Sequence, residues 1–103
     1  MKHLFDVPVN VRGRVSYFAG LMERQLKLND QKGGWSQCHP LWLLAKLNEE
    51  VGELGQRLNE LYAPDGKRFS HPDEFIVETT QEAVDVANVA MMLFDVLSEL
   101  IRH

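Results

Sequence analysis

Apolar residues recur at intervals of three and four along three stretches of the chain. This spacing places them on one face of an α-helix, because the helix repeats every 3.6 residues. The first stretch predicts a helix over about residues 11–28, and the following sequence NDQKGGW ends it with paired glycines. The stripe of this helix consists of Val15, Phe18, Leu21, Met22, Gln25 and Leu26.

The second stretch predicts a helix that opens near Pro40, since proline is favoured in the first helical turn. Its apolar residues alternate at three and four, which is typical of helices packed nearly parallel in a bundle. Gly52 and Gly55 weaken this helix, and we expect them to allow a neighbouring helix to approach closely. The seam consists of Leu44, Leu47, Val51, Leu54, Leu58 and Leu61.

The third stretch predicts a helix that begins after Ser70 or His71 and runs to Ile101, with a break near Thr79–Thr80 left open. The sequence between the second and third helices carries the turn residues Pro, Gly and Asp, and nothing in residues 62–75 assigns this loop a function. No strand pattern or internal repeat is present. The sequence predicts one all-α domain over residues 1–103, a bundle of about three to four helices.

Length and charge narrow the class of protein. A chain of 103 residues buries a small fraction of its surface, so we expect oligomerisation to help stabilise it. The formal net charge of −4 argues against a general nucleic-acid binder. No apolar run approaches the roughly 20 residues of a membrane span, and the single cysteine, Cys38, fits a reducing compartment. We therefore expect a cytoplasmic protein without a nucleic-acid or membrane partner.

Glutamates are set among the leucines of the second helix. At 100° per residue, Glu49 points well away from the apolar seam, which suits a solvated side chain. Glu50 lies on the border of the seam, with Glu53 beside it one turn farther on. Glutamates at such a border are common on surface helices, so the second helix alone does not indicate a site.

The third helix changes this interpretation. Glu82 projects into its apolar stripe and Asp85 lies along one flank, and burying a carboxylate is costly without a partner. Lys46 and Arg57 are long enough to reach it from the second helix. A metal ion is the alternative partner, because two acidic pairs at i, i+3 on antiparallel helices would offer the oxygen ligands that Mg²⁺ or Mn²⁺ prefers.

These acidic motifs resemble those of the MazG-like family of all-α nucleoside triphosphate pyrophosphohydrolases. The family pattern is EExxE on one helix and ExxD on the next, matched here by EEVGEL (Glu49–Leu54) and EAVDVAN (Glu82–Asn88). The upstream stretch WSQCHPLWLLAKLNEE is similar to the approach to the first motif in that family. The resemblance covers about residues 35–97, and the loop YAPDGKRFSHPDEF departs from the family pattern as an insertion.

The resemblance implies a bundle completed by dimerisation, as a homodimer or homotetramer, and Mg²⁺-dependent cleavage of a nucleotide between its α- and β-phosphates. By the same resemblance the metal ligands are Glu50, Glu53, Glu82 and Asp85, and Glu49 joins Glu50 as a catalytic group that helps to activate water. Mn²⁺ is the alternative ion.

Contacts to the substrate are predicted from single residues. Trp35 can stack on a base, Asn88 can donate to a base or ribose, and Lys46 lies one turn before Glu50 where it can meet a phosphate. For each, a structural role within the bundle is the alternative. Two other functions also remain open for the chain. One is a non-catalytic helical dimerisation module, and the other is a related enzyme acting on dUTP or phosphoribosyl-ATP.

Overall fold

The computed structural model describes residues 5–63 and 72–101. Within these ranges the chain forms three α-helices and a short 3-10 turn, with no strand: α1 (Gly13–Leu28), η1 (Asp30–Lys32), α2 (Pro40–Leu61) and α3 (Pro72–Ile101). The predicted all-α class is confirmed. Most of the loop predicted over residues 62–75 lies outside the described ranges, at residues 64–71.

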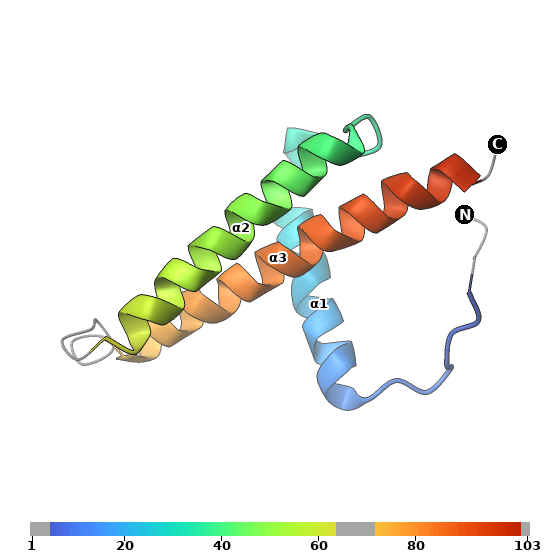
Figure 1. Ribbon diagram of the computed structural model, residues 1–103. Coiled ribbons are helices and arrows are strands. Elements are labelled where there is room, and N and C mark those ends of the chain that lie inside the picture. Colours follow the sequence, from blue (N-terminus) through green and yellow to red (C-terminus); the bar gives the residue numbers. More distant parts are fainter. Residues whose placement is uncertain (1–4, 64–71, 102–103) are drawn as a thin grey trace.

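α2 and α3 form an antiparallel hairpin, and α1 crosses α3 at a steep angle (Figure 1). Two side-chain hydrogen bonds join α1 to α3. Gln81 Nε2 donates to Gln25 Oε1 at 2.9 Å, and Asn88 Nδ2 donates to the carbonyl of Met22 at 3.2 Å. The hairpin is thus the main packing unit, with α1 attached to one of its helices.

The helix limits follow from local chemistry. Pro40 occupies the first position of α2, and His39 Nδ1 accepts the backbone N–H of Leu41 at 3.1 Å, which caps the helix. α3 shows no break at Thr79–Thr80. The two hydroxyls donate to the carbonyls of Phe75 and Val77 at 2.8 and 2.7 Å, so they bond to the helix itself without ending it.

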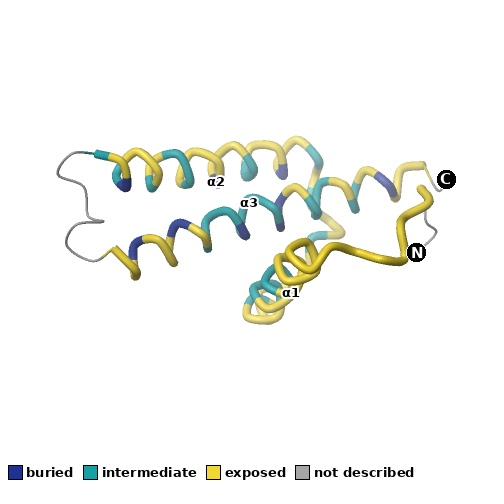
Figure 2. Tube along the Cα trace, turned by 90° about the horizontal axis from the view of Figure 1, so that it is seen from below, coloured by how far each residue is buried: buried dark blue, intermediate teal, exposed yellow. Residues whose placement is uncertain are grey.

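The core is thin and lies along the hairpin (Figure 2). The buried apolar side chains are Leu43, Leu61, Phe75, Val84 and Val89. The predicted seam of α2 packs only in part within the chain: Leu61 is buried and Leu47 and Leu54 are half-buried, whereas Leu44, Val51 and Leu58 are 44%, 48% and 41% exposed. The expectation for the two helical glycines was also wrong within the chain, because an added Cβ at Gly52 or Gly55 would meet no atom within 4 Å.

The single chain is more extended than a compact domain of its size. Its radius of gyration is 16.2 Å, against about 13 Å for a compact domain of this length. Its accessible surface is 8095 Å², against about 5900 Å² for a compact monomer of the same mass. None of the helices in the described ranges is both long and apolar enough to cross a bilayer.

Candidate metal centre

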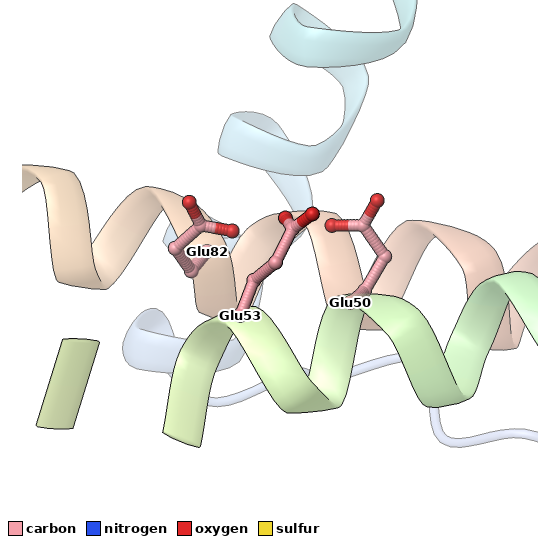
Figure 3. A group of neighbouring side chains, drawn as sticks. All are labelled: Glu50, Glu53 and Glu82. Carbon is pink, nitrogen blue, oxygen red and sulfur yellow. The ribbon is translucent and has the colours of Figure 1, made fainter. Parts of the chain in front are cut away.

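Three glutamates meet where the middle of α2 faces α3. Glu50 and Glu53 project from α2 and Glu82 from α3, and their carboxylates gather at one level of the hairpin (Figure 3). One carboxylate oxygen from each residue lies within 4.8 Å of the others. Glu50 is buried, Glu82 is half-buried and Glu53 is exposed, so the group is closed on one side and open on the other.

The local electrostatics disfavour three negative charges. Burial raises the pKa of Glu50, and the neighbouring charge of Glu53 raises it further against the opposing effect of Lys46. Burial and then Glu53 likewise raise the pKa of Glu82. In addition, Glu82 Oε2 is buried without a hydrogen-bond partner. A buried acceptor of this kind is costly unless a donor or a cation reaches it.

Two basic side chains flank the cluster without neutralising it. Lys46 Nζ lies 3.4 Å from Glu50 and 3.5 Å from Glu49. Arg57 forms a 2.7 Å ion pair with Glu78, while its Nε is 3.9 Å from Glu82. Of the two residues expected to reach Glu82, only Arg57 does so, and at a distance too long for a hydrogen bond.

Asp85 and Glu49 lie near the group of three but outside it. No oxygen of Asp85 belongs to the group of carboxylate oxygens that lie within 4.8 Å of one another. Burial and then Glu53 raise the pKa of its carboxyl, and Lys46 opposes them, so Asp85 shares the electrostatic field of the cluster. Glu49 has a side chain 59% exposed and pairs with Lys46. The roles of both residues stay predictions.

The three carboxylates offer the kind of oxygen ligands that a divalent cation prefers. Mg²⁺ binds oxygens at about 2.0–2.1 Å, so two ligands on opposite sides of the ion are about 4 Å apart. One oxygen from each of the three carboxylates lies within 4.8 Å of the others, which is close to that spacing. A cation here would neutralise the mutual repulsion and give Glu82 Oε2 a partner.

An apolar cavity of about 220 Å³ lies on the Lys46 side of the cluster. Three separate parts of the chain build it: the segment between α1 and α2, the start of α2, and α3. Trp35 and Trp42 contribute aromatic walls and Lys46 lies at the edge, which links the cavity to Glu50. The lining also includes Leu43, Met92 and the free thiol of Cys38.

Sequence reasoning missed the residue that holds Trp35. Trp35 Nε1 donates a 3.0 Å hydrogen bond to Asp95 Oδ2, sixty residues away on α3. No local pattern marks Asp95, because its partner is in another part of the fold. The bond ties the segment before α2 onto α3 and fixes one wall of the apolar cavity.

Asn88 is placed differently from its predicted substrate role. It is 4% exposed, and its amide group donates to Met22 of α1 as described above. Its Oδ1 is buried with no hydrogen-bond partner. The contact seen is therefore one within the bundle, and a contact to a nucleotide stays a prediction.

A second cavity, polar and about 350 Å³, opens on the other side of the cluster. Among the described residues that line it, Arg57 is the only basic one, and Glu53 and Glu82 of the cluster form part of its wall. The full lining is Glu53, Gln56, Arg57, Glu60 and Glu82.

No family model, curated protein or solved structure matches this chain. The functional conclusion therefore depends on the acidic motifs and on the geometry of the site.

Proposed function

We propose that the chain is a Mg²⁺-dependent nucleoside triphosphate pyrophosphohydrolase of the MazG-like type. The observation that carries the proposal is the convergence of Glu50, Glu53 and Glu82 from two helices, with one oxygen of each within 4.8 Å of the others. The unpaired, buried Glu82 Oε2 supports it, because this oxygen lacks the partner that a cation supplies. Mn²⁺ suits the same ligands.

The reaction is the attack of water on the α-phosphorus of a nucleotide. The bond between that phosphorus and the oxygen bridging to the β-phosphate breaks, giving a nucleoside monophosphate and pyrophosphate. Bound Mg²⁺ would neutralise phosphate charge and lower the pKa of the attacking water. Glu50, Glu53, Glu82 and Asp85 hold the ion, and no covalent nucleophile is required.

Proton transfer is assigned to the two adjacent glutamates of α2. Burial raises the pKa of Glu50, and a carboxylate placed beside the attacking water can accept its proton. Glu49 shares Lys46 with Glu50. The ammonium group of Lys46 therefore lies between the carboxylates of Glu49 and Glu50 and next to the apolar cavity.

The apolar cavity is the proposed site of the base. Trp35 and Trp42 offer aromatic faces on which a planar base stacks, and Lys46 stands between this cavity and the cluster, in position to meet a phosphate. Glu53 and Glu82 line the polar cavity, and Lys46 of the apolar cavity contacts Glu50. A nucleotide can therefore reach the apolar wall and the metal ligands together.

A second copy of the chain completes the bundle in this proposal. The exposed seam residues of α2 repeat every seven positions, at Leu44, Val51 and Leu58. The chain exposes about 2200 Å² more surface than a compact monomer would, and a standard interface buries about 800 Å² on each partner. A homodimer, or a homotetramer built from dimers, removes this surface from water. The proposed setting is the cytosol, where nucleotides and Mg²⁺ are present.

The decisive experiment is pyrophosphate release from a panel of ribo- and deoxyribonucleoside triphosphates, with and without Mg²⁺. The panel includes dUTP and phosphoribosyl-ATP, which test the related-enzyme alternative. Glu53→Gln and Glu82→Gln should each lower turnover by about a hundredfold or more while the helical circular dichroism spectrum is retained. Glu74→Gln, at an exposed acidic position on α3, is the matched control and should retain activity.

The exposed seam also favours one alternative function, a non-catalytic dimerisation module. That function predicts no turnover of any nucleotide in the panel. It further predicts that both glutamine variants become more stable to heat, with no response to Mg²⁺, because the substitutions then only remove repulsion between carboxylates. This combined result would replace the hydrolase with the module.

A further inference from the structure

The two flanks of the carboxylate cluster differ in chemistry. On one flank, Lys46 adjoins the apolar cavity with its two tryptophans. On the other flank, Arg57 forms part of the wall of the polar cavity together with Glu53 and Glu82. Lys46 and Arg57 are eleven residues apart on one helix, which separates their Cα atoms by about 16 Å along its axis. A ligand that spans the cluster would meet a different cation at each end.

Arg57 has the geometry of a side chain that can exchange one anion for another. Its shortest contact is the 2.7 Å pair with Glu78, whose side chain is 56% exposed, and such a pair contributes little to stability. The guanidinium also lies 5.6 Å from the centre of the Phe75 ring, which supports its position from below. Arg57 contacts Glu78 through one bond, from Nη1 to Oε2. A phosphate can accept two parallel N–H groups of a guanidinium, so exchanging Glu78 for a phosphate would add a contact.

We infer that Arg57 binds the terminal phosphates of the substrate in the polar cavity, so that the nucleotide lies with its base toward Trp35 and its phosphate chain toward Arg57. This inference rests on the proposed function. It adds the orientation of the bound nucleotide and a second site for phosphate. The pyrophosphate product would leave from the Arg57 flank. The monophosphate product would leave from the Lys46 flank.

The acidic character of the polar cavity sets a condition on binding. Among the described residues that line it, Glu53, Glu60 and Glu82 are acidic and Arg57 is basic. A bare phosphate chain would be repelled. We therefore expect inorganic pyrophosphate to bind in the presence of Mg²⁺ and not in its absence.

The test measures the binding of two product-like probes by isothermal titration calorimetry in Mg²⁺ buffer. The probes are inorganic pyrophosphate and the monophosphate of the preferred nucleoside, or each common nucleoside monophosphate if no preference is found. Arg57→Gln should weaken pyrophosphate binding about tenfold or more and leave monophosphate binding within about twofold. Lys46→Gln, the matched change on the other flank, should show the reverse pattern.

A further variant guards against a purely structural effect of removing Arg57. Glu78→Gln frees the guanidinium from its ion pair at an exposed position, and it should tighten pyrophosphate binding by a few-fold. Binding of Mn²⁺ alone, followed by electron paramagnetic resonance, should be retained in Arg57→Gln. Unchanged pyrophosphate affinity in both Arg57→Gln and Glu78→Gln would overturn the inference, as would equal losses for both probes.

The same experiment separates this inference from the proposed function. If the protein turns over nucleotides with Mg²⁺ but pyrophosphate affinity does not depend on Arg57, the proposed hydrolase function is supported. The orientation assigned to the bound nucleotide is then wrong. If the protein neither turns over a nucleotide nor binds pyrophosphate with Mg²⁺, both are wrong.

Discussion

Trp35 and Asp95 are joined by a 3.0 Å hydrogen bond from the indole N–H to a carboxylate oxygen, across sixty residues of sequence. Both residues are half-buried. The bond spans from the segment before α2 to the second half of α3, and it holds an aromatic wall of the apolar cavity. Asp95 therefore positions Trp35, although it lies outside both acidic motifs.

Replacing Asp95 should free Trp35. We expect Asp95→Ala to cost about 1–3 kcal/mol of folding free energy, because the indole N–H loses a charged acceptor. Asp95→Asn, which keeps an oxygen acceptor, should cost less. The measurements are urea denaturation and tryptophan emission in a Trp42→Phe background, where Asp95→Ala should shift the emission to longer wavelength. Emission that is the same in all three proteins would show that the bond does not hold Trp35 in solution.

For the proposed hydrolase, the same substitution should act on substrate affinity more than on chemistry. Because Trp35 lies at the proposed base site and away from the carboxylates, Asp95→Ala should raise KM several-fold and leave kcat within about twofold. Steady-state kinetics on the preferred nucleotide measure both constants. A large fall in kcat with unchanged KM would place Asp95 in a different role.

Stability should depend on pH through the carboxylates of the site. Burial, followed by the charge of Glu53, raises the pKa of Glu50, Glu82 and Asp85 in the folded protein. Between the ordinary carboxyl pKa of about 4 and these raised values, the folded state binds more protons than the unfolded state. The free energy of unfolding of the metal-free protein should therefore fall as pH rises through that window.

Mg²⁺ should reverse this dependence, because it binds the deprotonated carboxylates of the folded protein. At a concentration of 100 times Kd, the ion should add about 2.7 kcal/mol to the free energy of unfolding. Urea denaturation from pH 4 to pH 8, in EDTA and in Mg²⁺, measures both effects. Glu82→Gln should flatten the curve in EDTA and remove most of the Mg²⁺ effect. A curve in EDTA that rises with pH would contradict the raised pKa values.

The exposed seam of α2 offers a direct test of oligomerisation. Val51 and Leu58 are 48% and 41% exposed in the single chain, so a glutamate at either position should be tolerated by the hairpin and disfavoured in a subunit interface. We expect Val51→Glu and Leu58→Glu to lower the mass seen by light scattering after size-exclusion chromatography. Asn48→Glu, at an exposed polar position on the same helix, is the control and should leave the mass unchanged.

If wild type, both seam variants and the control all run as monomers with the same stability, the proposed interface is wrong. If the variants become monomers and also lose nucleotide turnover, the site depends on the second copy. That outcome would explain why so much apolar surface remains exposed beside the candidate centre.

The sequence by itself determined the three helices and the acidic pairs on α2 and α3. Helical periodicity, Pro40 and Pro72 are local signals, and the observed α2 and α3 begin at those two prolines. The spacing of Glu50 and Glu53 places both on one side of α2 whatever surrounds the helix. These features depend on residues a few positions apart, which is why they can be predicted from the chain alone.

Only the tertiary structure decided which face of α2 meets α3. The leucine seam predicted one face, but the packing buries Leu43 and Glu50, which lie outside the seam, and leaves Val51 of the seam exposed. The rotation of a helix against its neighbour is fixed by the sum of many contacts along both, and no single stripe contains that information. The same reason hid the pairing of Trp35 with Asp95 and the approach of Arg57 to Glu82, since each joins residues that meet only after the helices have packed.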